Sequence, residues 1–538
     1  MTIQSTMMDY QLTLTGILER AGRLFSKIEI VSNMPDKSRH RYTYAQLYQR
    51  SKQLAAALQM AGLKRGDRVA TMMWNSHAHY EVYFGAPCAG GVYHTLNFRL
   101  HPDDIIYIAN HAEDRFAIVD EVLLPLFEQV RDRTKIERVF VANRSDKPLP
   151  EGYECYEEFL ANAPTDYAFP RIDENDACGM CYTSGTTGRP KGVVYSHRAV
   201  VLHTYCICLA ETTGLTSRDT VMPVVPQFHA NAWGMPFAAA MVGAKMVMPG
   251  PHMDAASLLD LAADEQVTMA AGVPTIWIGI LHELDKDASR WQLSPRLRTV
   301  VGGSAMPESM IRGFFGHGIE TIHAWGMTEM TPIGTVSHLR PYMDEWPEDK
   351  QYEMRAKQGP SVPTVEARIV NENGEVPWDG ETMGELQVRG PCVASHYHDA
   401  ESDKWSEDGW FGTGDVVTVD DDGYIKITDR TKDLIKSGGE WISSVDLENA
   451  LMGHPAVSEA AVIAVPHPKW DERPLAVIVC KEGESASADD LKGHLSERFA
   501  KWWVPEGYAF VDEIPKTSAG KFKKTALREQ FDSWDWAD

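Results

Sequence analysis

The chain has 538 residues, of which 43% are hydrophobic and 24% are charged. A polypeptide of this length and composition is expected to form a soluble globular protein with two or three packed units. The formal net charge of −24 argues against nucleic acid or an anionic membrane as a partner, because attraction to phosphate is the main term in such binding. The net charge does not argue against small anions, which respond to local charge.

The cysteines and the apolar stretches indicate the compartment. Of eight cysteines, only Cys178 and Cys181 have the C-x-x-C spacing of metal or redox sites. No second pair completes a zinc site, so we expect a buried strand here, with a redox or metal module as the alternative. The apolar stretch 232–248 contains Pro236 and Lys245 and is too short to span a bilayer. We therefore expect a reduced, cytoplasmic enzyme without integral membrane association and without a leader peptide.

The first three-quarters of the chain alternate between helical and strand patterns. Residues 44–61 carry apolar side chains at helical spacing, and Gly62 and a turn lead into a buried strand at 69–73. The same helix–glycine–strand unit is expected at 258–272 and 295–303. This alternation predicts an α/β fold built in layers.

After Gly384 the pattern changes to short strands, expected at 385–389, 416–419 and 423–427. The acidic run Asp420-Asp421-Asp422 is read as a hairpin turn, since it lacks the spacing of an EF-hand calcium loop. A charged segment at 429–433 then precedes a βαββ-like tail. We therefore expect a large N-terminal domain at 1–428, a hinge at 429–433 and a small α+β domain at 434–538.

The most informative motif is the run from Thr183 to Gly192, which joins two expected strands. Its glycines let the backbone turn sharply around an anion, and its hydroxyl groups and Lys191 add donors and positive charge. It is not a Walker A loop, because Pro190 and Gly192 occupy the positions of the second glycine and the Mg²⁺-binding hydroxyl. The run predicts a cradle for polyphosphate.

This loop and the blocks that follow it resemble the adenylate-forming superfamily, which includes acyl-CoA synthetases, luciferases and the adenylation domains of peptide synthetases. The blocks occur in the family's order, at 227–233, 302–307, 323–329, 412–415 with 429–442, and 515–521. One of them, Gly302-Gly303-Ser304-Ala305-Met306, is not the G-x-S-x-G motif of serine hydrolases. A carrier domain is not expected, since the chain ends shortly after Lys521.

The resemblance implies a set of roles. Lys521 would bridge the carboxylate and the α-phosphate, and Glu329 and Thr183 would hold Mg²⁺. Lys432 would be the hinge residue and would also bind the nucleotide. The further nucleotide-binding residues would be Ser184, Gly185, Thr186, Thr187, Gly188, Lys191, Gly302, Gly303, Ser304, His323, Ala324, Trp325, Gly326, Met327, Thr328, Asp415, Ile427 and Arg430. Asp415 would accept both ribose hydroxyls, with Arg430 beside it.

The acyl group and coenzyme A complete the implied site. His229, Trp233, Gly302 and Gly326 would line the acyl pocket, with His229 at its mouth. Acetate-specific relatives carry tryptophan at the position of Gly326, so we expect a pocket open beyond two carbons. The coenzyme A side would be Lys436, Gly438, Gly439, Glu440 and Trp441, with Lys436 also catalytic.

The resemblance implies an AMP-forming acid:CoA ligase that uses ATP, Mg²⁺ and coenzyme A and that has a β-barrel-like subdomain and a mobile C-terminal domain. The chain is most similar to medium-chain acyl-CoA synthetases and to ligases for the thioether acid 3-(methylthio)propionate. The resemblance also allows a homodimer. An aryl-CoA ligase or a luciferase-like enzyme shares the adenylation step and stays an alternative.

Overall fold

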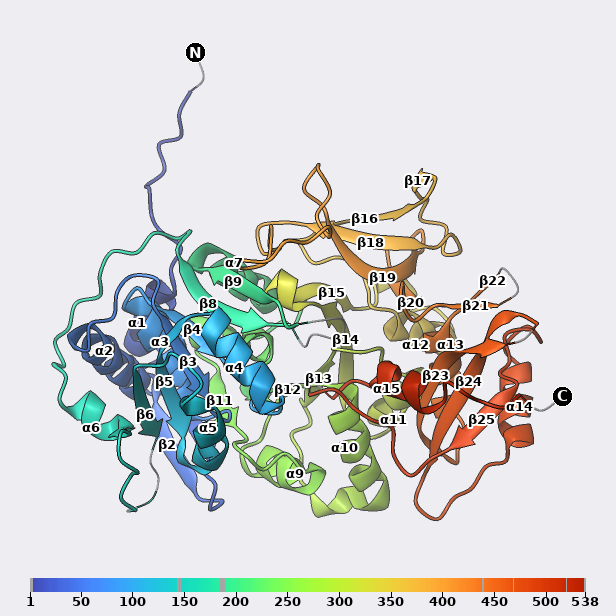
Figure 1. Ribbon diagram of the computed structural model, residues 1–538, viewed down its shortest axis with the longest axis horizontal. Coiled ribbons are helices and arrows are strands. Elements are labelled where there is room, and N and C mark those ends of the chain that lie inside the picture. Colours follow the sequence, from blue (N-terminus) through green and yellow to red (C-terminus); the bar gives the residue numbers. More distant parts are fainter. Residues whose placement is uncertain are drawn as a thin grey trace.

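The computed structural model describes residues 3–142, 145, 147–183, 189–437, 440–467, 469–518 and 520–536. Two large sheets form its body (Figure 1). The first has eight strands in the order β15 (Ile333–Ser337), β14 (Glu320–Gly326), β13 (Arg298–Val301), β12 (Met269–Gly272), β10 (Thr220–Pro223), β11 (Lys245–Met248), β1 (Glu29–Asn33) and β2 (Arg39–Thr43). The second has seven, in the order β7 (Glu154–Cys155), β6 (Arg138–Ala142), β5 (Asp114–Asp120), β3 (Arg68–Met72), β4 (Val92–Thr95), β8 (Ala177–Tyr182) and β9 (Gly192–Ser196).

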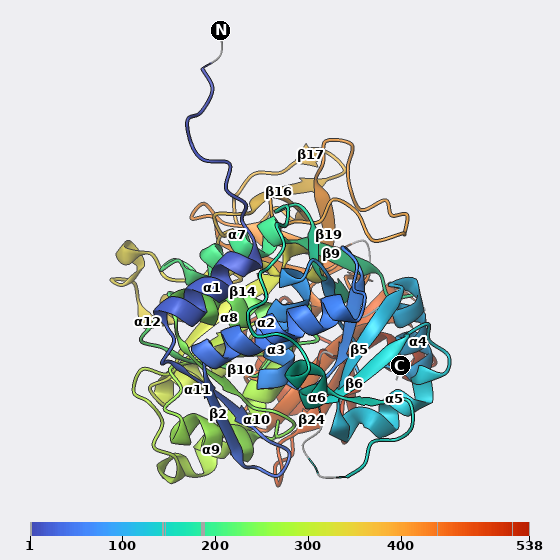
Figure 2. The same cartoon turned by 90° about the vertical axis from the view of Figure 1, so that its left-hand side faces the viewer.

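Helices cover both faces of these mostly parallel sheets, which confirms the α/β layers. One continuous core joins the inner faces of the two sheets to α1 (Leu14–Leu24), α2 (Tyr44–Met60), α3 (His77–Cys88), α7 (His197–Cys208) and α8 (Met235–Val242). Every residue of α3 is buried. The outer face of the first sheet carries α9 (Ala255–Asp264), α10 (Pro274–Asp287) and α11 (Glu308–Gly316), and that of the second carries α4 (Pro102–His111) and α5 (Leu124–Arg131). The result is a five-layer body (Figure 2).

Side chains alternate between the two faces of a strand, so one sheet contributes to two apolar cores. On β3, Val69 belongs to the central core and Ala70 to the outer one, and Ile118 and Val119 divide in the same way on β5. Both faces are apolar because both are covered by helices. The helix expected at the start of 295–303, before β13, does not form. Instead, α10 ends at Asp287 and the chain near Pro295 makes a turn.

The region expected to be barrel-like is a five-stranded antiparallel sheet. Its order is β17 (Gly374–Glu375), β16 (Glu366–Asn371), β18 (Gly384–Arg389), β19 (Phe411–Val419) and β20 (Ile425–Arg430). The three strands expected here fall within or overlap β18, β19 and β20. Because β20 continues through Asp429 and Arg430, it runs two residues into the segment expected as the hinge.

The C-terminal unit is a small α+β fold, as expected. It contains β21 (Ile435–Ser437), β22 (Glu440–Ile442), α13 (Ser444–Met452), β23 (Val457–His467), β24 (Asp471–Cys480), α14 (Ala488–Ser496), β25 (Gly507–Phe510) and α15 (Lys524–Gln530). Two apolar clusters, formed by its own residues, lie on either face of its sheet.

The fold gives no support to the alternative of a redox or metal module at Cys178 and Cys181. Cys178 and Cys181 are free thiols inside β8, and burial raises the pKa of both. Within the described ranges, the one group of three potential metal ligands is Asp420, Asp421 and Asp422. None of the described helices is long and apolar enough to cross a membrane.

Candidate active site

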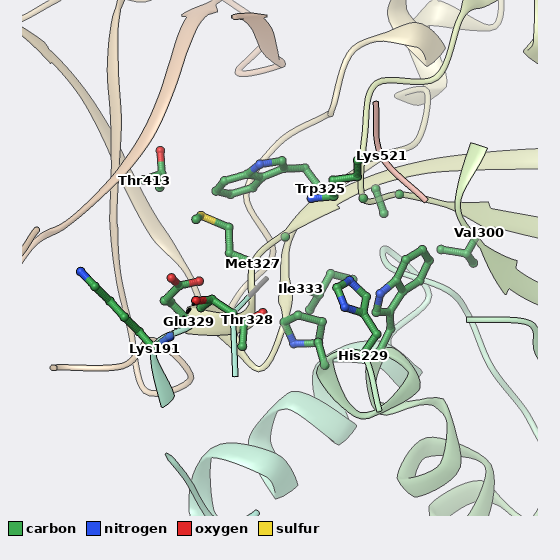
Figure 3. Close-up of a pocket in the computed structure, with 18 of the residues that line it drawn as sticks. Lys191, His229, Val300, Trp325, Met327, Thr328, Glu329, Ile333, Thr413 and Lys521 are labelled. Atoms are coloured by element: carbon green, nitrogen blue, oxygen red, sulfur yellow. Dashed lines mark hydrogen bonds between the residues drawn. The ribbon is translucent and has the colours of Figure 1, made fainter. Parts of the chain in front are cut away.

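A cavity of about 220 Å³ lies where the body, the antiparallel sheet and the C-terminal unit meet (Figure 3). The ends of β13 and β14 form one wall, Thr183 and Lys191 form another, and Lys521 enters from the C-terminal unit. The cavity carries an excess of positive charge although the protein is acidic. Against the carboxylate of Glu329, its walls present Arg189, Lys191, Lys404, Arg430 and Lys521. This charge favours a polyanionic ligand.

Thr183 and Lys191 close the base of the expected phosphate loop. The Thr183 N–H donates to the Lys191 carbonyl at 2.9 Å, and the Lys191 N–H donates to the Thr183 hydroxyl at 3.2 Å. The Lys191 ammonium lies 4.8 Å from the centre of the Tyr397 ring. The five residues 184–188, predicted to contact phosphate, lie outside the described residues. Both ends of the loop therefore face the cavity.

Glu329 is a buried carboxylate at the same end, with 4% of its surface exposed. Its Oε1 accepts a hydrogen bond from the Tyr397 hydroxyl at 2.6 Å, and burial together with this carboxylate raises the pKa of Tyr397. The preceding Thr328 is fixed through its carbonyl, which accepts from the Tyr195 hydroxyl at 2.8 Å. With the Thr183 hydroxyl also in the wall, the site offers oxygen donors of the kind Mg²⁺ prefers.

Asp415 anchors a second group of residues. It is 3% exposed, accepts from the Trp325 indole N–H at 2.9 Å, and lies 3.3 Å from the Arg430 guanidinium. An adjoining recess contains further residues predicted to bind the nucleotide, namely Ser304, His323, Ile427 and Lys432. Ala324, Trp325 and Gly326 line both the recess and the cavity, so the two spaces are neighbours.

His323 supports the site through the backbone. Its Nδ1 lies 2.9 Å from the Ala356 carbonyl, and its Nε2 accepts from the Met306 N–H at 3.3 Å. Burial lowers its pKa to about 4, so the ring is neutral and can accept this bond. His323 thereby holds the turn that contains Gly303 and Ser304.

Lys521 projects from a tight turn in the C-terminal unit. The Thr517 N–H donates to the Lys521 carbonyl at 2.7 Å, and the Lys521 N–H donates to the Thr517 hydroxyl at 3.1 Å. Burial, together with the nearby Arg430, lowers the pKa of the Lys521 ammonium to about 8. Lys521 is therefore a charged group at neutral pH that has lost much of its water.

The apolar end of the cavity begins at His229. Burial, and then the nearby Lys521, lower the pKa of His229 to about 4, so its ring is neutral. The next residues, from Ala230 to Gly234, all adopt left-handed backbone angles, with φ between 43° and 74°. Such angles are unfavourable for residues other than glycine and gather at functional sites. This turn directs Trp233 into the cavity, where Ile207, Thr213, Met235, Val300 and Ile333 complete the wall.

Two predicted glycines, Gly302 and Gly326, owe their identity to close backbone approaches, whereas Gly303 is favoured by its positive φ. A Cβ at Gly302 would lie 2.7 Å from the Ala324 carbonyl oxygen, and at Gly303, where φ is +90°, it would lie 3.9 Å from the Lys521 Cε. At Gly326 it would lie 2.0 Å from the Pro332 carbonyl oxygen. We expected the missing side chain at Gly326 to leave room for the acyl chain. Gly326 lines the cavity, and the close approach of the Pro332 backbone is a second reason for glycine at this position, so the open pocket stays a prediction.

The residues predicted to bind coenzyme A lie elsewhere. Lys436 and Trp441 face each other across the β21–β22 hairpin, with the Lys436 ammonium 5.7 Å from the Trp441 ring. Trp441 is 45% exposed, and neither residue lines the cavity or the recess. Glu440 begins β22, and Gly438 and Gly439 lie outside the described residues.

Sequence reasoning missed several cavity residues. Tyr397 and Lys404 lie between β18 and β19, where no motif drew attention to them. The Lys404 ammonium lies 3.4 Å from the Thr413 carbonyl and belongs to the same wall. The available signal was a basic or aromatic residue just before the Gly412–Asp415 motif, which is weak by itself.

The fold and this cavity are those of an adenylate-forming enzyme. The chain aligns with the crystal structure of an anthranilate CoA ligase in complex with anthranoyl-AMP, at a TM-score of 0.87 and 27% identity, over 97% of this chain and 98% of that one.

Two family matches give the finer assignment. The AMP-binding enzyme family matches residues 18–398, and the AMP-binding enzyme C-terminal domain matches residues 446–521. The chain belongs to the AMP-binding enzyme family.

Two curated relatives align over nearly their whole length. A long-chain-fatty-acid–CoA ligase of Thermus thermophilus is 48% identical, over 98% of this chain and 97% of that protein. A 3-methylmercaptopropionyl-CoA ligase of Ruegeria lacuscaerulensis is 44% identical, over 98% of each chain.

Proposed function

We propose that this protein is an AMP-forming acid:CoA ligase and that the cavity is its adenylation site. The observation that carries the proposal is the position of Lys521. Its side chain lines a cavity that has Arg430 and the phosphate-loop ends on one side and the His229–Trp233 apolar end on the other. Asp415, which pairs with Arg430, lines the adjoining recess. A carboxylate and the α-phosphate of ATP would meet at this ammonium.

In the first step, a carboxylate oxygen attacks the α-phosphorus, the bond to the β-phosphate breaks, and pyrophosphate leaves. Both reactants are anionic, so the main task of the protein is positioning and charge neutralisation. Lys521 and Lys191 supply that charge, Thr328 lies at the α-phosphate, and Asp415 and Arg430 hold the ribose. Neutral His229 contacts the acid at the pocket mouth.

Glu329 and Thr183 suit Mg²⁺. The Tyr397 hydroxyl occupies Oε1 of Glu329 as a hydrogen-bond donor, which orients the carboxylate and leaves its other oxygen for a cation. A single carboxylate with phosphate and water oxygens is adequate for this ion. When bound, Mg²⁺ would add positive charge beside the phosphate oxygens.

In the second step, the thiolate of coenzyme A attacks the acyl carbon, the bond to AMP breaks, and the thioester forms. This step requires the hairpin of Lys436 and Trp441, which lies away from the cavity. We propose that residues 434–538 rotate on residues 429–433 relative to residues 1–428, with Lys432 as the pivot, so that Lys521 is withdrawn and this hairpin is presented.

The cysteines fit a cytoplasmic enzyme. They are free, mostly buried thiols, which is typical of proteins in the reducing cytoplasm.

The apolar end favours an acid with a short-to-medium aliphatic chain or a thioether. The wall offers the acyl group the uncharged side chains of Ile207, Met235, Val300 and Ile333. The Thr213 hydroxyl donates a hydrogen bond to the Ile207 carbonyl at 2.7 Å. The conformation in which Lys521 occupies the cavity corresponds to the adenylate-forming step.

A pyrophosphate-release screen tests the proposal. Purified protein with ATP and Mg²⁺ is offered acids of two to twelve carbons, 3-(methylthio)propionate and aryl acids, and thioester formation is followed after adding coenzyme A. We expect acid-dependent release with medium chains or the thioether acid. Release with aryl acids alone would move the assignment to an aryl-CoA ligase, and no acid-dependent release would refute adenylation.

A further inference from the structure

The turn that carries Lys521 rests on a loop of the body that no motif identified. Asn97, which follows β4, donates from Nδ2 to the Ser518 hydroxyl at 3.0 Å. Arg99 donates from Nη1 to the Ser518 carbonyl at 3.5 Å. Ser518 lies next to Thr517, whose backbone and hydroxyl shape the Lys521 turn. Two contacts therefore hold Ser518, which lies within the turn that positions Lys521.

The Asn97 side chain is also held by a hydrogen bond within its own loop, which does not involve the C-terminal unit. Its Oδ1 accepts from the Arg99 N–H at 3.0 Å, so the amide oxygen is used within its own loop and the nitrogen is left to donate outward. The loop itself continues from β4, whose neighbours in the sheet are β3 and β8. Asn97 is thus a rigid donor at the edge of the body.

Arg99 links this loop to the acyl end of the cavity. Its guanidinium lies 5.6 Å from the centre of the Phe228 ring and 5.8 Å from that of Trp74. Phe228 immediately precedes His229, and Phe98 packs against the Phe228 ring with centroids 4.7 Å apart. Across the described residues Arg99 has no carboxylate partner, so its contacts are two aromatic faces and the Ser518 carbonyl. Such cation–π contacts hold a guanidinium in one place.

We propose that Asn97 and Arg99 are positioning residues that hold the Lys521 turn in the adenylate-forming orientation and couple it to the Phe228–His229 segment. The proposal rests on the function proposed above. When the C-terminal unit rotates away, Ser518 leaves both partners, and the second step proceeds without them. The loop therefore acts in one half-reaction only.

Measuring the two half-reactions separately tests this role. In Asn97→Ala and Arg99→Ala we expect acid-dependent pyrophosphate exchange to fall about fivefold each, the size expected for one lost hydrogen bond, with KM for ATP nearly unchanged. Thioester formation from supplied acyl-adenylate and coenzyme A stays within about twofold of wild type. Arg131→Ala is the matched control, because Arg131 also lies over an aromatic ring, Tyr153 at 4.4 Å, and donates to a carbonyl, Gly152 at 2.8 Å.

A mutant cycle separates docking from a general loss of structure. Ser518→Ala reproduces the Asn97→Ala defect, and the double variant is no worse than either single one, because both remove the same bond. Hydrogen exchange of the peptide that contains Lys521 becomes faster in these variants and stays unchanged in Arg131→Ala. This readout requires no activity.

Additive defects, an equal loss in both half-reactions, or unchanged hydrogen exchange in the Lys521 peptide would overturn the positioning role. Failure of the wild type to exchange pyrophosphate with any acid would instead count against the proposed function. The two failures are therefore distinguishable.

Discussion

The body and the C-terminal unit both contribute to the cavity, but they are built differently. In the body, one apolar core runs through both large sheets and reaches the antiparallel sheet at Leu386 and Val417. The C-terminal unit has separate clusters formed by its own residues, such as Ile435 and Leu475. Its contacts with the rest include polar ones, such as the Lys426–Asp446 ion pair at 2.9 Å and the Asn97–Ser518 bond. A core of this extent holds one geometry, whereas a polar interface can break and reform.

This difference suggests why the reacting groups are divided as they are. The Asp415–Arg430 pair on the antiparallel sheet and the His229 turn on the body would serve both steps. Lys521, which only one step would need, stands on the separate unit. The predictions below test this division, starting with the largest expected effect.

Lys521→Ala should lower the adenylation rate by about a hundredfold to a thousandfold, because it removes a charge-stabilising group from a water-poor site. Thioester formation from supplied acyl-adenylate should stay largely intact. Stopped-flow measurements of each half-reaction check this, with Lys516→Ala as the control, since Lys516 lies on the same loop and pairs with Glu459. Equal loss in both half-reactions would show that Lys521 is not confined to the first.

Lys432→Pro should impair the second step instead. Proline fixes φ and removes the rotation that a pivot needs, so adenylate should form and thioester production should fall by roughly tens-fold. Lys432→Ala keeps the backbone free and is the control. Quenched-flow detection of accumulated acyl-adenylate checks this expectation. Normal thioester turnover in the proline variant would place the pivot at another residue.

Sequence reasoning predicted the α/β layers because these follow from periodicity and glycine positions. It reached Lys521, Asp415 and Glu329 because they belong to local motifs. It did not predict the left-handed turn after His229. Ala230, Ala232 and Trp233 have no local preference for positive φ, and the surrounding packing imposes this conformation. Contacts between distant segments, such as Asn97 with Ser518, leave no local pattern. Gly326 was identified, but its close contact with the Pro332 backbone was not predicted.

The pH profile tests the environment of Lys521. Its pKa is lowered to about 8, so the ammonium loses its proton as pH rises through that value. The adenylation kcat/KM should therefore fall about tenfold per unit well above pH 8. Lys521→Arg should show no such alkaline limb, because the guanidinium keeps its charge. A wild-type profile that is flat to pH 10 would contradict the lowered pKa.

Lys404→Ala should raise the KM for ATP by about fivefold and change kcat less, because the lost charge contributes to binding. Lys404→Arg should recover most of the affinity. Lys350→Ala, which removes a cation lying 3.9 Å from the Trp346 ring, is the control. Steady-state kinetics with varied ATP check this, and an unchanged KM would exclude Lys404 from the polyphosphate site.

The smallest effects concern the acyl end, where we expect residues of the body to set the chain length of the acid. Each buried methylene contributes about 0.8 kcal/mol, so the wild type should gain about fourfold in kcat/KM per added carbon until the pocket is full. Met235→Ala should extend that gain by one or two carbons, and Ile207→Phe should shorten it, with KM for ATP unchanged. Met222→Ala removes the same side chain from a cluster outside the cavity, with a comparable cost in stability, and should keep the wild-type profile. Rates across acids of two to twelve carbons, measured on variants with confirmed folding, decide the point. If Met235→Ala and Met222→Ala gave the same profile, the chain length would be set outside the Ile207–Met235 end, and the short-to-medium assignment would lose its structural support.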